Sequence, residues 1–324
     1  MASSALSGFR LREPRVVGAL PASSRNDNLL VEDALGQRYV LRRYRRNPQR
    51  ERIEFQLGFQ QHLLRCGFPT SRVVATHAGN LMLVLAGDLW ALFTYVEGAA
   101  YDYEREGQVR DAARWLARFH STCEGFRSRE VLTDTIPDVR RWWLDGEGEL
   151  RRLAEMFAGL GVEAELDFLH GWHSWLLRAW PRAALDTLPP AWVHGDYHGR
   201  NMVFVGDRVV GLFDFDVVHR GFRIEDIAMA LFAFGREHRE SDRIRAPTAR
   251  IFVDEYERDA RLSDLERLAL PMMTILVQAR TAPRYALRQR AGEDPTRVLR
   301  AHVRRMRTLQ DQMASLGPTL FEGR

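Results

Sequence analysis

The periodicity of the chain changes near Gly98, and the part before that point is rich in β-strand patterns. Residues 29–32 and 38–44 are two β-rich runs joined by a Gly-containing turn, and residues 81–96 predict a second hairpin with a Gly-Asp pair at its turn. Between these hairpins, residues 53–64 carry apolar side chains at helical spacing and stop before a glycine. These segments predict an antiparallel sheet accompanied by one helix.

The part after Gly98 is mainly helical in pattern. Residues 109–121 and 164–180 each place apolar side chains on one helical face, and residues 245–315 are helical by periodicity. The chain has 324 residues, of which 45% are hydrophobic, and this is enough for one large domain or two joined lobes. The order of elements therefore predicts an α+β fold whose second part is larger and mainly helical.

One segment interrupts the helical pattern. Residues 192–204 read WVHGDYHGRNMVF, with two histidines, an aspartate and an asparagine between two apolar runs. The following residues predict a hairpin that turns at a Gly-Asp pair and carries Asp214 back beside Asn201. Asp216 is the next carboxylate; we expect it to point to the side opposite Asp214 if the strand continues, and its role is left open. A buried helix comes next, with Asp226 near its start, where a carboxylate can accept backbone N–H bonds.

Three kinds of site are compatible with this segment. His194, Asp196 and His198 could bind zinc or iron. A structural loop, with its polar groups satisfied by nearby backbone, is the second interpretation. The third is a phosphoryl-transfer loop, because the protein-kinase catalytic loop separates its Asp and its Asn by four residues, as Asp196 and Asn201 are separated here.

The predicted hairpin favours the third interpretation. It brings together a carboxylate from Asp214 and an amide oxygen from Asn201, a pair that suits magnesium bound with substrate phosphates. A zinc site would place two histidines on one helical face with a general base nearby. His194 and His198 instead flank a glycine in a segment without helical periodicity.

Composition indicates a cytoplasmic protein. The chain has only two cysteines, which implies no disulfide framework and suits a reducing compartment. The N-terminal residues lack the apolar core of a signal peptide. The richest apolar stretch is interrupted by Asp88 and is too short to span a bilayer, so that we expect no membrane association.

The basic residues raise the question of nucleic-acid binding. All 47 of them are arginine, and the net charge is +4. Six arginines near the C-terminus could form one helical face: Arg280, Arg284, Arg288, Arg300, Arg304 and Arg307. A solvated arginine-rich helix surface is the commoner explanation of such a pattern, and a nucleic-acid partner is not expected.

Several motifs together resemble one family of kinases. They are HGDYHGRN at residues 194–201, the hairpin, LFDFD, EDIAMAL at the start of the next helix, and WLARFH at residues 115–120. In this combination they resemble the aminoglycoside phosphotransferase and choline kinase-like family, which includes type II homoserine kinases and SrkA-type kinases. The resemblance covers roughly residues 20–260. It implies a two-lobed protein kinase-like fold, with a nucleotide-binding lobe at residues 1–97 and a catalytic and acceptor-binding lobe at residues 98–324.

The resemblance also implies roles for the residues of the loop and the hairpin. Asp196 would be the catalytic base that orients the acceptor hydroxyl and takes its proton. Asn201 and Asp214 would hold magnesium on the ATP phosphates. His194 would brace the loop, and Asp226 would hold its backbone.

In the first lobe, the family has a strand lysine that contacts the α- and β-phosphates. Arg42 occupies that position here, and alternation along the strand directs Arg43 to the opposite face, toward solvent. The family pairs the lysine with a helix acid, for which Glu54 is available while Gln56 aligns with it.

Two segments of the first lobe would bind the nucleotide. The phosphate-covering segment contains no glycine between residues 21 and 31, so that Ser24 and Asn26 would supply its polar contacts. Backbone groups of Thr94, Tyr95 and Val96 would bind the adenine edge.

These observations predict an ATP- and magnesium-dependent kinase that phosphorylates a hydroxyl group of a small metabolite or natural product. A peptide Ser/Thr kinase of the same fold is one alternative. A pseudokinase that binds without catalysis is another, because Arg42 and the glycine-free segment depart from the family pattern.

Overall fold

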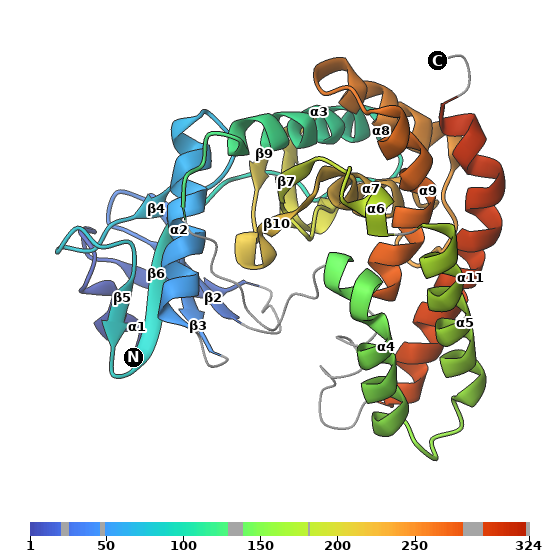
Figure 1. Cartoon of the computed structure of the whole chain (residues 1–324). Coiled ribbons are helices and arrows are strands. Elements are labelled where there is room, and N and C mark those ends of the chain that lie inside the picture. Colours follow the sequence, from blue (N-terminus) through green and yellow to red (C-terminus); the bar gives the residue numbers. More distant parts are fainter. Residues whose placement is uncertain (21–25, 46–48, 129–138, 181, 281–293, 322–324) are drawn as a thin grey trace. The chain divides into compact units, whose positions relative to one another are not determined.

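The computed structural model describes residues 1–20, 26–45, 49–128, 139–180, 182–280 and 294–321 (Figure 1). The chain forms two compact units. The first comprises Met1–Tyr101, Gly125–Thr133 and Arg200–Asp216, and the second comprises Asp102–Glu124, Asp134–Gly199 and Val217–Arg324. Among the described residues, none of the helices combines the length and the hydropathy that crossing a bilayer requires.

The first unit is built on an antiparallel sheet. Its strands follow the order β1-β2-β3-β6-β4, and β5 pairs with β6 beside them. Their bounds are β1 Arg15–Ala19, β2 Asn26–Glu32, β3 Arg38–Tyr44, β4 Val73–Val74, β5 Leu83–Leu85 and β6 Asp88–Thr94. The register of β1 against β2 shifts between Val16 and Gly18. The predicted second hairpin is present as β5–β6, but its two turn residues are Ala86 and Gly87, both with positive φ.

Both faces of this sheet are covered by apolar side chains. On one face, Leu41 and Leu92 pack in a cluster with Leu6 from helix α1 (Ala2–Leu6). On the other face, Ala91 packs in a cluster with Ile53 and Leu57 from helix α2 (Arg50–Arg65). The alternation of side chains along β3 and β6 produces this division. The predicted sheet with its helix is confirmed, whereas α1 and β1 were not predicted.

A hairpin from the middle of the chain belongs to the first unit. Its strands are β8 (Met202–Val205) and β9 (Arg208–Leu212). The backbones of Ala99 and Phe204 exchange two hydrogen bonds, of 2.8 and 2.9 Å. The Leu212 N–H also donates to the Pro69 carbonyl at 2.7 Å. These bonds attach the hairpin to residues that precede it by more than a hundred positions.

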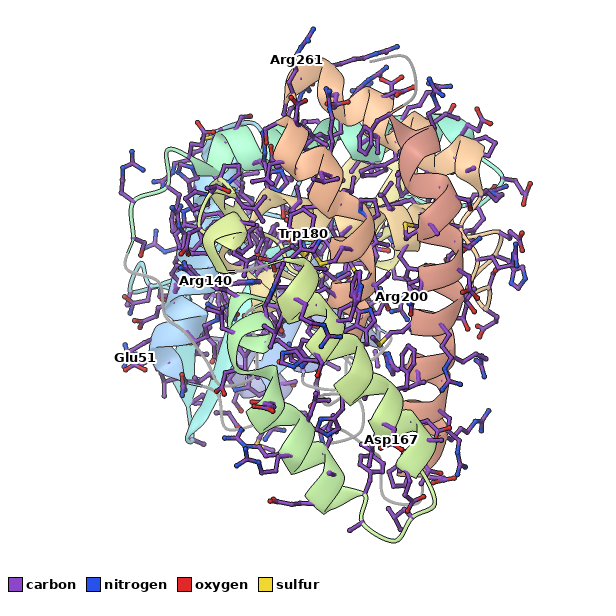
Figure 2. All side chains as sticks on the ribbon, turned by 45° about the vertical axis from the view of Figure 1, so that its right-hand side comes forward. Glu51, Arg140, Asp167, Trp180, Arg200 and Arg261 are labelled. Carbon is purple, nitrogen blue, oxygen red and sulfur yellow. The ribbon has the colours of Figure 1, made fainter. Side chains whose placement is uncertain are left out.

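The second unit is mainly helical, as predicted. Its helices are α3 Glu106–Cys123, α4 Val139–Met156, α5 Glu163–Ala179, α6 Arg182–Leu185, α7 Arg223–Gly235, α8 Ala246–Asp259, α9 Asp264–Ala279 and α11 Pro295–Leu320. A two-stranded ribbon pairs β7 (Pro190–Val193) with β10 (His219–Phe222). Helices α4 and α5 lie side by side, and α5 contacts α11 (Figure 1). In Figure 2, Asp167 lies on α5 and Trp180 directly follows its C-terminal end.

The core of the second unit is formed by α7 and α9. The buried residues of α7 include nearly every apolar position along the helix, and α9 is buried to a similar extent. A helix that is apolar all round is suited to the centre of a helical layer. Helix α7 therefore gives its first turn, which carries Glu225 and Asp226, a fixed position beside the β7–β10 ribbon.

Candidate active site

A buried carboxylate holds the loop that follows β7. Asp226, in the first turn of α7, is fully buried and accepts the backbone N–H groups of His194 at 2.6 Å and of Gly195 at 2.8 Å. Two consecutive N–H groups bonded to one carboxylate fix the direction of the chain at that point, since charge-assisted hydrogen bonds are short and strong. The first two residues of the HGD segment are thereby held by α7.

Two residues from other helices complete the environment of Asp226. His120 of α3 lies with Nε2 3.2 Å from Asp226 Oδ2, and its Nδ1 lies 2.8 Å from the hydroxyl of Tyr256 in α8. Burial opposes ionisation of Asp226, but His120, the charge of His194 and the Gly195 N–H together lower the pKa of this carboxyl. Asp226 is therefore an anion inside the second unit.

Neither His120 nor Tyr256 was predicted as a site residue. His120 ends the WLARFH motif, where it follows the buried face that includes Leu116 and Phe119, so that the motif contained a usable signal. Tyr256 occupies an ordinary apolar position of α8, and nothing in its local sequence distinguishes it from a core tyrosine.

His194 and Gly195 determine where Asp196 is placed. The ring of His194 is fully buried, and its Nδ1 accepts the Asp196 N–H at 3.3 Å. Gly195 has a φ of +76°, and a Cβ at this position would lie 2.9 Å from the Val217 carbonyl oxygen. A larger residue would be both strained and blocked there. The main chain leading to Asp196 has little freedom as a result.

Asp196 itself presents a partly exposed side chain, with 39% of its area accessible. Its Oδ1 lies 3.3 Å from Nε2 of His198, for which the sequence pattern suggests only the role of a zinc or iron ligand. From Gly199 the chain forms a 3₁₀ turn, η1 (Gly199–Asn201), and then enters β8.

In the first unit, Asn201 and Asp214 lie at the base of the β8–β9 hairpin. The Phe213 N–H donates to the Asn201 carbonyl at 2.9 Å and closes the hairpin next to both residues. Asp214 has a φ of +65°, in the left-handed region, so that the strand does not continue into it. The hairpin brings the backbones of these two segments together, and the convergence of the two side chains stays a prediction.

The donor set at this base consists of oxygen atoms, an amide from Asn201 and a carboxylate from Asp214. Such a pair fits a hard divalent cation that takes its other ligands from phosphates and water. Among the described residues, no group of three or more His, Cys, Asp or Glu side chains could hold a metal ion by itself. The residues therefore suit magnesium held together with a nucleotide better than they suit a structural zinc site.

Asp216 faces Arg42 rather than the side opposite Asp214. Regular pairing of β9 stops at Leu212, and Asp216 lies in the 3₁₀ turn η2 (Phe215–Val217). Its carboxylate lies 3.5 Å from the Arg42 guanidinium and accepts the Asn26 side-chain amide at 3.0 Å. The expectation of an opposite-facing Asp216 was wrong in its premise, because residues two apart along a strand share one face.

Arg42 is held from two sides of its strand. Its Nε donates to Asn28 Oδ1 at 3.0 Å, and its guanidinium lies over the Phe93 ring. Burial disfavours the charge of Arg42, but Asp216, Tyr44 and Asp214 together outweigh this effect and raise the pKa of the guanidinium. A fixed cation is thus present on the α2 side of the sheet.

Helix α2 contributes no acid to Arg42. Glu54 is half-exposed and pairs with Arg50 of its own helix at 2.8 Å. Gln56 instead donates to the backbone carbonyl of Asp216 at 3.0 Å, and Arg52 donates to the same carbonyl at 3.1 Å. The carboxylate that pairs with Arg42 therefore comes from the LFDFD segment.

Arg43 was expected to point to solvent, and this is wrong. It does lie on the face opposite Arg42, but it pairs with Asp88 at 2.8 Å and its guanidinium lies over the Trp90 ring. Only 28% of its side chain is exposed. The cause is the neighbouring strand β6, which places an acid and an aromatic ring across from it.

Of the predicted adenine-binding residues, Thr94 ends strand β6, and Tyr95 and Val96 follow it. The Thr94 N–H donates to the Arg72 carbonyl at 2.9 Å, and the Tyr95 N–H donates to the Arg38 carbonyl at 3.0 Å. These two donors are used within the sheet, so that contacts to a base would use the Val96 N–H and backbone carbonyls. Of the predicted phosphate contacts, Asn26 is engaged with Asp216, and Ser24 lies outside the described residues.

The arginines considered for nucleic-acid binding are engaged within the second unit where the structure describes them. Arg280 is buried and pairs with Glu225 at 2.7 Å. Arg300 donates to the Gly161 carbonyl, Arg304 lies 3.3 Å from Asp242, and Arg307 lies over the Phe168 ring. Arg284 and Arg288 lie outside the described residues. All of these contacts are made to residues of the second unit itself.

Comparisons with known proteins give the family and the fold of the chain. The model of the phosphotransferase enzyme family matches residues 17–270. A homoserine kinase of Sinorhizobium medicae is 30% identical over 250 residues, which cover 76% of this chain and 72% of that protein.

Two solved structures share the fold. An amicoumacin kinase in complex with AMP-PNP, Ca²⁺ and Ami has a TM-score of 0.71 at 14% identity, over 96% of this chain and 92% of that one. A microcompartment-associated aminopropanol kinase has a TM-score of 0.68 at 16% identity, over 99% of both chains. The predicted kinase-like fold class is therefore confirmed.

Proposed function

Because this chain belongs to the phosphotransferase enzyme family, as its match over residues 17–270 shows, we propose that it transfers the γ-phosphoryl group of ATP to a hydroxyl group of a small metabolite, with Mg²⁺ as the metal ion. The observation that carries this proposal is the pair of hydrogen bonds by which Asp226 holds the backbone of the loop that presents Asp196. Phosphoryl transfer depends on positioning and charge stabilisation, which rigidly held carboxylates can supply.

In the proposed reaction, Asp196 is the catalytic base. The acceptor oxygen forms a bond to the γ-phosphorus while the bond from that phosphorus to the β–γ bridging oxygen breaks, and ADP leaves with the electron pair. Asp196 orients the hydroxyl and takes its proton. Asn201 and Asp214 would hold the magnesium ion, which when bound neutralises part of the phosphate charge. His194 and Asp226 support the loop.

The nucleotide is proposed to bind through the first part of the chain. We assign residues 1–97 to nucleotide binding and residues 98–324 to catalysis and acceptor binding. Arg42 would meet the α- and β-phosphates, since its planar fork can contact two phosphate oxygens. Ser24 and Asn26 would add polar contacts, and Thr94 to Val96 would bind the adenine edge.

Homoserine is the first acceptor to be tested. The 30% identity to a homoserine kinase extends over most of both chains, whereas the likeness to the amicoumacin and aminopropanol kinases is a likeness of fold. The comparisons give no support to a peptide acceptor or to a pseudokinase. We propose a cytoplasmic location, on the ground that a chain with two cysteines suits a reducing compartment.

The test is ADP release from MgATP against a panel of hydroxyl compounds that includes homoserine and 1-amino-2-propanol, with mass spectrometry of the products. We expect one small acceptor to gain the mass of a phosphoryl group. Asp196→Asn should keep ATP affinity and lower turnover by about a hundred- to ten-thousand-fold. An Asp196→Asn variant with near-normal turnover would remove this residue from the mechanism.

A further inference from the structure

His198 lies in the same loop as Asp196 and contacts its carboxylate. Nε2 of His198 is 3.3 Å from Asp196 Oδ1, and only 15% of the His198 side chain is exposed. We propose that His198 is a positioning residue for the catalytic base: its Nε2–H donates to Asp196 and fixes the orientation of that carboxylate. This inference rests on the role proposed above for Asp196.

The other ring nitrogen determines which tautomer the site favours. His198 Nδ1 is buried and has no hydrogen-bond partner within the described part of the chain. A neutral imidazole carries one N–H, and a buried N–H without an acceptor is costly. The proton is therefore better placed on Nε2, where Asp196 can accept it. With this tautomer, His198 acts as a donor to the base and does not compete with it for the proton of the acceptor.

A donor at this position matters because the carboxylate of an aspartate is not fixed by its backbone. Rotation about the Cβ–Cγ bond of Asp is broad and has no sharp staggered minima. The main chain at Asp196 is held by His194, whose Nδ1 accepts its N–H, but that bond leaves the carboxylate plane undetermined. The contact from His198 restricts this rotation.

The metal interpretation of the same histidine has less support. Nδ1 of His194 faces the Asp196 N–H, and Nε2 of His198 faces the Asp196 carboxylate. The two histidines therefore use these nitrogens within the loop and do not direct them to one common point. Each of them serves Asp196, one through its backbone and the other through its side chain.

The test compares His198→Leu with His198→Gln in the full-length protein. Gln places an amide N–H near the position of Nε2 and should keep turnover with the best acceptor within about fivefold of the original, because the donor is retained. Leu removes the donor and should lower kcat by about tenfold to a hundredfold, the value of a hydrogen bond to a charged group, with the KM for ATP unchanged. His238, an exposed histidine of the second unit, provides the matched control as His238→Leu and His238→Gln.

A second readout does not depend on activity. In ¹⁵N-histidine-labelled protein, the resonances that disappear in His198→Gln belong to His198. They should show a protonated Nε2 and a bare Nδ1 at neutral to slightly alkaline pH. A bare Nε2 with the proton on Nδ1 would overturn the inference, as would full kcat in His198→Leu or an equal loss of kcat in both variants. If the original protein phosphorylates no acceptor of the panel, the proposed function fails instead, and the NMR result remains interpretable.

Discussion

Replacing Asp226 by asparagine should separate the support of the loop from the chemistry of the loop. In the structure, Oδ2 of Asp226 faces two donors, the His194 N–H and His120 Nε2, and Oδ1 accepts the Gly195 N–H. The side chain of asparagine has only one oxygen. If this oxygen takes the place of Oδ2, the NH₂ group takes the place of Oδ1 and cannot accept the Gly195 N–H. One buried donor left unsatisfied costs about 1–3 kcal/mol, and loss of charge assistance on the other two bonds adds about 1 kcal/mol each.

We therefore expect Asp226→Asn to lower the free energy of unfolding by about 3–5 kcal/mol, a large share of the stability of a typical domain. Urea denaturation followed by tryptophan fluorescence measures this change. Asp259→Asn is the control, because Asp259 is 45% exposed at the end of α8 and its nearest arginine is 4.0 Å away. Its effect should stay within about 0.5 kcal/mol. A loss for Asp226→Asn no larger than that of the control would refute the assigned role.

The pH dependence of the same pair of proteins gives an independent check. The pKa of Asp226 is lower in the folded protein than the ordinary value of about 4. The unfolded chain thus binds this proton first as the pH falls, so that the stabilisation is complete above about pH 4 and is lost as the pH falls through the lower folded value. Asp226→Asn should remove this component of acid sensitivity. An unchanged acid slope would mean that another group causes it.

The contacts of Arg42, His302 and Asp214 lead to three more expectations. Arg42→Ala should weaken ATP binding or turnover severely while Arg43→Ala should spare ATP binding, as measured by calorimetry; equal effects would contradict the assignment of faces. Burial and the charge of Arg305 lower the pKa of His302 to about 4, so that the unfolded chain alone takes up this proton between about pH 6.5 and 4. Stability should fall by up to about 3 kcal/mol over that range, and His302→Leu should abolish this fall. Asp214→Ala should eliminate the tightening of ATP binding by magnesium, and a persistent magnesium effect would exclude Asp214 as a ligand.

The motif-bearing half of the chain could be predicted because its geometry is local. The spacing of Asp196 and Asn201, and a hairpin that returns Asp214 beside Asn201, are set by a few neighbouring residues. Turn chemistry and strand alternation act over the same short distances. The sheet and the helical second part were predictable for the same reason.

Contacts between distant segments were not predictable in this way. The pairing of Asp216 with Arg42 joins two segments that are far apart along the chain, which local patterns do not reveal. The bonds of His120 to Asp226 and Tyr256 join three helices through residues that local periodicity treats as core positions. Tertiary packing decides such contacts, and a single sequence carries no direct record of it.

The irregular first strand affects how copies of the chain can associate. β1 lies at one edge of its sheet and is largely exposed, and such an edge can pair with a strand of another molecule and start aggregation. The register shift between Val16 and Gly18 interrupts the regular row of backbone donors and acceptors. Arg15, which pairs with Glu32, adds a charged group at the start of the strand. An incoming strand would find only short stretches to pair with, and the irregularity thereby protects the sheet against edge-to-edge polymerisation.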